Sequence, residues 1–243
     1  MIIKNALILL SFFLFIGCGG TSSTVINQSD TNSTEVTQNG VTVTSYERGF
    51  INVDECNVIV DKVFLNICYD NSLKVAKAVS YTLDGTLVHQ LNIVPRPSFY
   101  SEIQVELTNR AKYSDYTGSG YDRGHLAPDA SFDWSQESLD ATYSLANIIP
   151  QVPVVNQQMW VDVENYERTK AVDLGTVNVL NIVKYSSTPT RIGANQIAVS
   201  DGYFKVLYKD AYKECFYYAN DLNATSVGDT LALHQVNCNT VAY

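Results

Sequence analysis

The 243-residue sequence is poor in positive charge. Its 16 lysines and arginines are outnumbered by 25 aspartates and glutamates, and the formal net charge is −9. Proteins that attract nucleic acid through their overall field carry an excess of basic residues, and this chain does not. An activity on polyanions must therefore depend on a local site rather than on the charge of the whole protein.

Long apolar runs are also missing. The most apolar stretch, Ala6 to Ile16, follows Lys4 and is shorter than the roughly 20 residues that a membrane-spanning helix needs. This pattern predicts a signal peptide over residues 1–17. The sequence Gly17-Cys18-Gly19 resembles the lipobox of bacterial lipoproteins, in which the cysteine is lipidated; an ordinary secretory signal is the alternative. We therefore expect an exported, membrane-anchored lipoprotein with its lipid on Cys18, facing the periplasm or the cell surface.

Residues 18–45 contain no aromatic side chain and consist largely of Ser, Thr, Asn, Gln and Val. Such a segment buries too little apolar surface to offset the entropy lost on ordering it. It is predicted to be a flexible polar tether. Residues 46–243 are then long enough for one domain with a sizeable core, and they contain no internal repeat.

The spacing CxxC is absent, which disfavours a four-cysteine zinc site. Four cysteines remain after Cys18, namely Cys56, Cys68, Cys215 and Cys238. An even number of cysteines outside the cytoplasm favours disulfides. Three pairings are possible, and proximity in the sequence favours Cys56–Cys68 with Cys215–Cys238.

The apolar pattern predicts many short strands and one long helix. Strands are expected at residues 58–69, 74–83, 86–94, 145–149, 177–185, 196–200, 203–208 and 215–219, with Asp84-Gly85 as a two-residue hairpin turn. Residues 136–145 fit a short helix or a strand. The predicted helix is Asn156–Lys170, which lacks Gly and Pro. Strands on both sides of one central helix indicate the α+β class with a mainly antiparallel sheet.

Two polar patterns stand out from this background. The stretch Ser119–Ser131 (SGYDRGHLAPDAS) places three polar side chains within the four residues 122–125, too many for a buried strand, so we expect it in a loop. The predicted helix carries Asn156, Trp160, Glu164 and Arg168 at spacings of four, which puts them on one broad face. Taken alone, this stripe is also what a solvated face with a Glu164–Arg168 pair would show.

Read together, three motifs resemble the DNA/RNA non-specific endonucleases of the ββα-metal class. They are YDRGH (Tyr121–His125), LANIIPQ (Leu145–Gln151) and NQQMWVDVENYER (Asn156–Arg168), and the resemblance extends over about residues 60–220. It implies a ββα-metal nuclease fold and an enzyme that hydrolyses phosphodiester bonds of DNA and RNA, leaving 5′-phosphate ends. It also implies one Mg²⁺ as cofactor, with Mn²⁺ as the alternative ion.

The resemblance assigns roles to the base and to the metal ligands. His125 matches the general base, a role open to an imidazole because it titrates near neutrality. Asn156 matches the single direct metal ligand, and its amide oxygen is a hard donor that suits Mg²⁺. Glu164 matches the carboxylate that holds the hydrated ion through its waters.

Arginines are expected to bind the substrate phosphate. Arg123 and Arg168 match the family's phosphate-binding positions, and Arg168 is favoured for the negative charge of the transition state. Arg96 is a third, more loosely aligned candidate. Asp122 is expected to orient the loop and Arg123, and Gly124 to allow a close backbone approach to the metal or a positive φ.

Other polar residues are expected to be structural, among them Asn147, Trp160, His89 and His234. Two rival functions stay open. One is a catalytically decayed nuclease scaffold that serves as a surface lipoprotein for DNA binding or adhesion, although His125 and Asn156 are both retained. The other is a structural lipoprotein in which DRGH is accidental, and the matching helix disfavours it.

Overall fold

The structure is a computed structural model, and it describes residues 34–38, 41–45 and 55–241. The predicted signal peptide and Cys18 lie outside these residues. Within the expected tether, Thr34–Gln38 (β1) and Val41–Ser45 (β2) pair antiparallel. Thr and Val favour extended backbone, which is consistent with these two short strands.

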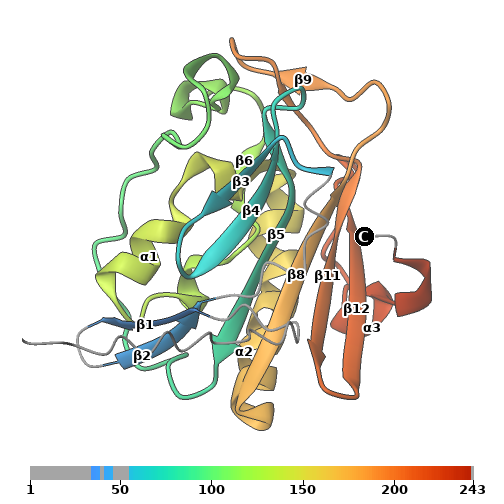
Figure 1. The fold of residues 1–243 in the computed structure, drawn as a ribbon. Coiled ribbons are helices and arrows are strands. Elements are labelled where there is room, and N and C mark those ends of the chain that lie inside the picture. Colours follow the sequence, from blue (N-terminus) through green and yellow to red (C-terminus); the bar gives the residue numbers. More distant parts are fainter. Residues whose placement is uncertain (1–33, 39–40, 46–54, 242–243) are drawn as a thin grey trace, which may run out of the picture. The chain divides into compact units, whose positions relative to one another are not determined.

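A seven-stranded sheet organises the described residues that follow (Figure 1). Its order is β13 (Gln235–Val236), β12 (Tyr212–Ala219), β11 (Gly202–Lys209), β8 (Thr176–Lys184), β5 (Val75–Asp84), β4 (Leu65–Asp70) and β3 (Val58–Asp61). Every neighbouring pair runs antiparallel. The predicted α+β class with a mainly antiparallel sheet is confirmed.

The two faces of the sheet bury different cores. The long helix α2 (Trp160–Leu174) and a ribbon of β6 (Asp122–His125) and β7 (Ile148–Gln151) pack on one face, over the larger core. Figure 1 shows α2 running behind β5, β8 and β11. Along β8, Val177, Val179 and Val183 belong to this core, whereas Leu180 belongs to a smaller core on the other face.

The smaller core contains both disulfides. Cys56 is bonded to Cys68 of β4, and Cys215 of β12 is bonded to Cys238 in the 3₁₀ turn η8 (Cys238–Thr240). The Cα–Cα distances are 5.1 and 5.3 Å, within the normal range for a disulfide. The pairing favoured by proximity in the sequence is confirmed.

Two predicted strands take a different course. The strand expected over residues 58–69 is interrupted between β3 and β4, where Val63 has a φ of 69°. The hairpin expected at Asp84-Gly85 does not form, and residues 86–94 make turns instead of a strand. Gly85 is required for a different reason, because a Cβ on it would lie 2.2 Å from the Ala171 carbonyl oxygen of α2.

The segment between residues 136 and 151 contains three elements. Helix α1 (Gln136–Thr142) begins at Ser135, whose hydroxyl accepts a hydrogen bond from the Ser138 N–H at 3.1 Å. The 3₁₀ turn η6 (Leu145–Asn147) leads into β7. Pro150 lies within β7 rather than ending a strand, which a two-stranded ribbon tolerates because each of its strands has a free edge.

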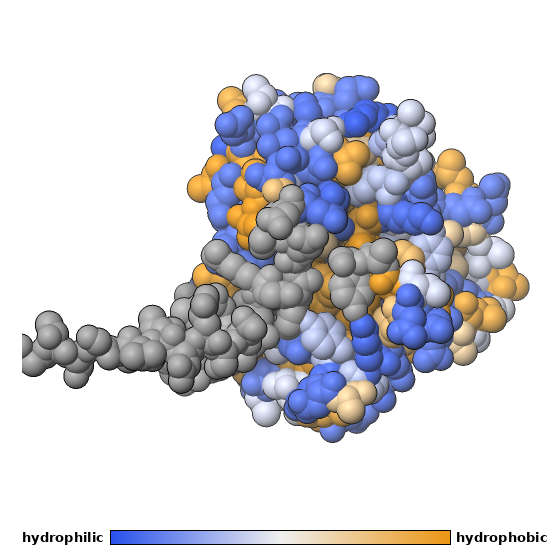
Figure 2. Space-filling view, turned by 45° about the vertical axis from the view of Figure 1, so that its right-hand side comes forward, coloured by the Kyte–Doolittle hydropathy of each residue, from blue (hydrophilic) through white to orange (hydrophobic). Residues whose placement is uncertain are grey.

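The described surface mixes polar and apolar side chains. Figure 2 shows hydrophilic residues over much of one side, with hydrophobic residues in smaller groups between them. Exposed apolar side chains include Val94, Ile103 and Val227. Within the described ranges, no helix has the length and apolar character that crossing a bilayer requires.

Trp160 anchors α2 to the sheet, and its replacement tests this packing. Its ring is fully buried, with edge contacts to Tyr203 at 4.8 Å and Tyr218 at 5.2 Å between ring centroids. We expect Trp160→Ala to lower the free energy of unfolding by about 3–5 kcal/mol, because truncating a buried aromatic leaves a cavity. Urea denaturation followed by circular dichroism measures this loss. Val172→Ala, at a 53% exposed position of the same helix, is the control; equal midpoints for the two variants would contradict the packing.

Candidate active site

The DRGH residues form a strand, not the expected loop. In the ribbon, Asp122 pairs with Gln151, Arg123 with Pro150, Gly124 with Ile149 and His125 with Ile148. The partner strand β7 is fully buried and supplies the apolar contact with the core. Because β7 does this, β6 can keep its three polar side chains half-buried.

Gly124 is needed for close packing inside this ribbon. A Cβ at this position would lie 1.9 Å from Oε1 of Gln151. Gly124 is not among the glycines with positive φ. Of the two alternatives expected for Gly124, the positive φ is wrong; the Gln151 side chain is the described group that approaches it closely.

The predicted helix is present, but it begins with a π-helical turn. This turn, η7 (Val155–Met159), holds Asn156 and leads directly into α2. Asn156 is half-buried. Single π turns recur at functional sites, and this one sets the position of Asn156 independently of the regular helix that carries Glu164.

Asp122 joins the strand to the start of the helix. Its carboxylate accepts a hydrogen bond from the Asn156 amide nitrogen at 3.0 Å and another from the Gln157 amide nitrogen at 2.7 Å. Asp122 therefore orients the helix amides, and it makes no ion pair with Arg123 among the described contacts. With its nitrogen engaged, the Asn156 amide turns its oxygen away from Asp122, and no described residue donates to that oxygen.

His125 lies between aromatic rings. Its ring centroid is 5.4 Å from that of Phe99 and 5.1 Å from that of Tyr143. Nε2 has no hydrogen-bond partner in the described part of the chain. Burial lowers the pKa of His125 to about 4; the negative charge of Asp129 opposes this shift and the positive charge of Arg96 adds to it. The neutral ring, which can accept a proton, is therefore favoured at neutral pH.

Glu164 is half-buried and accepts no hydrogen bond from the residues that the structure describes. Burial raises the pKa of its carboxyl to about 8. The positive charge of Lys205 opposes this rise more strongly than that of Arg168, whereas the nearby carboxylate of Glu167 reinforces it. The surface ion pair with Arg168, open as an alternative from the sequence, is not among the described salt bridges.

Arg168 is buried, with 6% of its surface exposed. Its Nη1 donates to the Ser131 hydroxyl at 3.2 Å and its Nη2 donates to the Asn165 side-chain oxygen at 2.5 Å. The solvated helix face that the stripe might have been is therefore excluded for Arg168. Its guanidinium is held from two sides.

A buried network lies behind Arg168, and the sequence motifs do not predict it. Glu167 accepts hydrogen bonds from Ser131 at 2.9 Å, from Tyr81 at 2.9 Å and from Lys205. Glu167 and Lys205 are both fully buried. Glu167 lies within the motif Asn156–Arg168 but is given no role there, and Lys205 lies outside all three motifs.

The other two arginines are held in different ways. Arg123 places its guanidinium 4.1 Å from the ring centroid of Tyr113, and its Nε has no described partner. Arg96 forms salt bridges with Asp129 at 3.4 Å and Asp133 at 3.0 Å, and its Nη1 has no described partner. Each of the two thus keeps a buried N–H without a described acceptor, which suits binding of an anion.

The residues expected to be structural make structural contacts. Asn147 is fully buried, and its amide bonds to the backbone of Ala127 and Thr142. His234 contacts Asp229 at 2.8 Å and the Tyr217 carbonyl oxygen at 3.1 Å, and its ring stacks on Tyr218. None of these contacts involves His125, Asn156 or Glu164.

Comparison with known proteins identifies the family of this chain. The family described as DNA/RNA non-specific endonuclease matches residues 25–241. The chain belongs to the DNA/RNA non-specific endonuclease family. Mitochondrial endonuclease G of Bos taurus and of Homo sapiens are each 38% identical over 127 residues, which is 46% of this chain and 41% of either relative. A nuclease of Nostoc sp. is 44% identical over 59 residues, 24% of this chain and 22% of the relative.

The fold has a counterpart among solved structures. A crystal structure of the EndoG/EndoGI complex superposes with a TM-score of 0.67 at 24% identity, over 75% of this chain and 81% of that chain. This similarity supports the ββα-metal nuclease fold. The aligned parts of the endonuclease G sequences are less than half of their length, so the similarity in sequence concerns a part of each relative.

Members of this family depend on a divalent metal, and the residues present fit a hydrated one. The described residues contain no group of three or more His, Cys, Asp and Glu side chains suited to a metal. Asn156 nevertheless offers a hard amide oxygen with no described donor, and Asp122 fixes the orientation of that amide. Glu164 offers a carboxylate free of direct hydrogen bonds. Few protein ligands and retained waters are what Mg²⁺ prefers.

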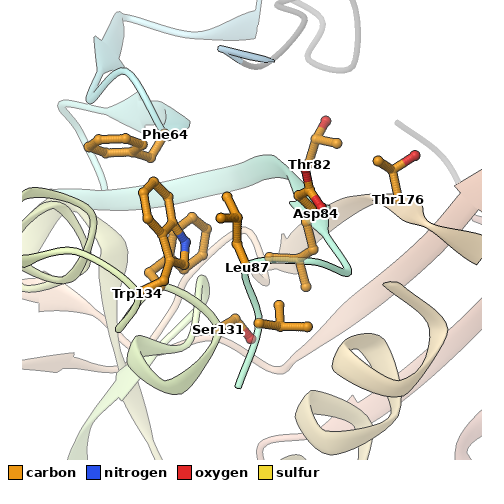
Figure 3. A pocket seen from close by; sticks show the side chains of 10 residues that line it. Phe64, Thr82, Asp84, Leu87, Ser131, Trp134 and Thr176 are labelled. Atoms are coloured by element: carbon orange, nitrogen blue, oxygen red, sulfur yellow. The ribbon is translucent and has the colours of Figure 1, made fainter. Parts of the chain in front are cut away.

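A small cavity beside the network is not this site. Its volume is about 50 Å³, which is room for one or two water molecules. Figure 3 shows Phe64 and Trp134 at one end and Thr82, Asp84 and Thr176 at the other, with Leu87 between them. The cavity reaches Ser131 of the network, but His125, Asn156 and Glu164 do not line it.

The lowered pKa of His125 can be measured directly. The ordinary imidazole value is about 6.5, so the unfolded chain takes up a proton at a higher pH than the folded one. We expect the His125 ring resonances of the metal-free protein to titrate below pH 5, and the stability due to this residue to be lost as pH falls from about 6.5 toward 4. NMR titration, with His125→Asn for assignment, gives the value. A midpoint near 6.5 would show that the ring is solvated.

Proposed function

We propose that this chain is a metal-dependent endonuclease that hydrolyses phosphodiester bonds of DNA and RNA, with His125 as the general base and one Mg²⁺ as cofactor. The observation that carries the proposal is the 3.0 Å hydrogen bond from Asn156 to Asp122. This hydrogen bond places the β-strand that carries His125 beside the helix that carries Asn156. Both residues can then act on the same phosphodiester bond.

The chain's residues can perform the steps of hydrolysis. The neutral His125 takes a proton from the attacking water, whose oxygen forms the new bond to phosphorus. The bond between phosphorus and the 3′ oxygen breaks, the 3′ oxygen takes a proton from a second water molecule, and the phosphate stays on the 5′ oxygen. Arg123 and Arg168 donate to the phosphate oxygens, where charge develops in the transition state.

The cofactor would be held by the Asn156 amide oxygen and, through water, by Glu164. Bound Mg²⁺ supplies positive charge beside the phosphate and the leaving oxygen. Mn²⁺ has similar ligand preferences and is the alternative ion. Arg96 is a substrate-binding residue only through Nη1, because its other nitrogens face carboxylates.

The proposed contacts reach phosphates rather than base edges or the 2′-hydroxyl. Sequence is read at base edges, and the 2′-hydroxyl distinguishes RNA from DNA. An enzyme that contacts neither is expected to cut both nucleic acids. Membership of the DNA/RNA non-specific endonuclease family supports this choice of substrates.

The segment before the domain supports a location for the activity. We propose export through the signal peptide of residues 1–17 and membrane anchoring by a lipid on Cys18. The two disulfides fit an oxidising compartment. Metabolic labelling with a radioactive fatty acid, compared between the natural chain and Cys18→Ala, tests the anchor.

Plasmid nicking tests the enzyme. With Mg²⁺ we expect cleavage of supercoiled DNA and of RNA, complete loss in EDTA, and a fall of about 10²–10⁴-fold in kcat for His125→Ala, the usual contribution of a general base. Sealing of the nicks by DNA ligase would report 5′-phosphate and 3′-hydroxyl ends. Activity that survives EDTA or the alanine change would falsify the mechanism. Binding of DNA without cleavage would favour the catalytically decayed surface module.

Replacing Asp122 tests the hydrogen bond between Asp122 and Asn156. Asp122→Ala leaves the Asn156 amide free to rotate, so its oxygen is presented to the ion for only part of the time. We expect the Mg²⁺ concentration for half-maximal nicking to rise about 10-fold or more, in the range found when outer-shell partners of metal ligands are removed. Gln157→Ala removes the other donor to Asp122 and serves as the control. An unchanged Mg²⁺ requirement in Asp122→Ala would show that the carboxylate is not needed to orient the ligand.

A further inference from the structure

Tyr113 is an exposed aromatic side chain next to the DRGH strand. With 51% of its surface exposed, it is the most exposed aromatic residue in the described part of the chain; Tyr100, the next, is 36% exposed. It lies in the 3₁₀ turn η4 (Tyr113–Asp115), in the long connection that leads to β6. An aromatic ring left in water loses the contribution that burial would make, so its position calls for an explanation.

The turn that carries Tyr113 is firmly held. Asp115 is almost fully buried and accepts hydrogen bonds from the Lys112 backbone at 2.8 Å and from the Asn195 backbone and side chain at 2.9–3.0 Å. Gly193, with φ of +67°, packs its Cα against Asp115 so closely that a Cβ would clash at 2.4 Å. On the other side, the Tyr116 hydroxyl donates to the Ile148 carbonyl oxygen of β7 at 3.1 Å. The exposed ring therefore stands on a rigid base.

The ring is also tied to a phosphate-binding group. The Arg123 guanidinium lies 4.1 Å from its centroid, and the Phe99 ring packs beside it at 6.4 Å with a tilt of 41°. Arg123 leaves Nε free of described partners. The planar cation thus lies over the ring and keeps a free donor suited to a phosphate, while half of the tyrosine surface stays exposed and suits a flat apolar partner.

We propose that Tyr113 is a stacking platform for the nucleobase next to the phosphodiester bond that is cut. This inference rests on the proposed function and adds a base-binding subsite to it. In a nucleotide only the sugar separates phosphate from base, so a strand held by Arg123 brings an adjacent base to the Tyr113 ring. Stacking accepts every base, because each has a π face, and is stronger for the larger purines.

The subsite selects unpaired nucleotides. A base inside a duplex already has both faces covered by its neighbours, so it can stack on Tyr113 only after the strand has opened locally. The subsite therefore favours adenine or guanine over cytosine or thymine, any base over an abasic residue, and single strands over duplexes. The sugar is not read, which keeps DNA and RNA equivalent.

The rival role for Tyr113 is to hold Arg123 by a cation–π contact. The two roles differ in one measurable respect. If the ring serves only Arg123, its loss slows the cleavage of every substrate by the same factor. If the ring binds a base, its loss slows only those substrates that have a base to stack.

A cycle of two changes separates these roles. The substrates are single-stranded DNA oligonucleotides with one normal phosphodiester among cleavage-resistant linkages, flanked by adenine, by cytosine or by an abasic nucleotide. We expect Tyr113→Leu to lower kcat/KM about 10-fold for the adenine substrate, less for the cytosine substrate, and less than 2-fold for the abasic one. Tyr113→Phe keeps the ring and should match the natural chain. Equal losses on all three substrates would overturn the proposal.

A control and a second readout complete the test. Tyr212 also lies beside a cation, Lys170 at 5.8 Å, but it contacts Tyr166 and Glu214 at the far end of α2; Tyr212→Leu should leave all three rates unchanged. In a His125→Ala background, quenching of 2-aminopurine at the flanking position reports stacking without cleavage, and Tyr113→Leu should abolish it. Failure of the natural chain to cut any substrate refutes the proposed function, whereas cleavage without a purine preference or quenching refutes the subsite alone.

Discussion

The position of helix α2 depends on one buried carboxylate, Glu167. It receives hydrogen bonds from Tyr81 on β5, from Lys205 on β11 and from Ser131 in the 3₁₀ turn η5 (Asp129–Ser131), so three separate elements meet on it. An ionised carboxylate taken out of water costs several kcal/mol unless its oxygens are paired. Only one position of the helix lets all three donors reach the Glu167 carboxylate. If the helix slid or rotated, these hydrogen bonds would break and the buried carboxylate would be left unpaired.

The chemistry of the proposed site follows from that fixed register. Arg168 comes next along the chain and shares Ser131 with Glu167, which holds its guanidinium in place. Glu164 lies one turn earlier, on the side that is still accessible to solvent. At the start of the helix the π turn and the Asp122 carboxylate settle the direction of the Asn156 amide. In the polar stripe, Trp160 and Arg168 are thus buried, whereas Asn156 and Glu164 are half-buried.

Much of this arrangement could be predicted from the sequence, and the remainder fails for physical reasons. The class, the central helix, the presence of most strands and the disulfide pairing followed from periodicity and spacing. The predicted hairpin at Gly85 is wrong because this glycine is required for a close contact with α2. A local sequence pattern carries no information about such distant neighbours. The DRGH residues are predicted as a loop for the same reason, because the buried apolar side chains that they lack are supplied by their partner strand β7.

The parts of the site that were missed are those without a motif. Lys205 occupies a position at which strand periodicity predicts a buried side chain, and nothing local reveals that a helix carboxylate lies opposite it. The ring of Tyr143 lies near His125 only because the chain folds back on itself. Residues within the motifs, by contrast, were identified by the resemblance, which carries information about distant contacts that one sequence does not contain.

The acidic balance of the chain is compatible with a phosphate site because charges act over short distances. At physiological ionic strength the Debye length is about 8 Å, so exposed carboxylates elsewhere on the surface are largely screened from a bound phosphate. Within that range the three arginines are already oriented by Ser131, Tyr113 and Asp133, and little side-chain entropy is left to lose when an anion binds. The protein then combines weak long-range attraction for nucleic acid with a preorganised local binding site for phosphate. Encounter with nucleic acid would be slow, but the geometry of the bound phosphate would not depend on the net charge of the protein.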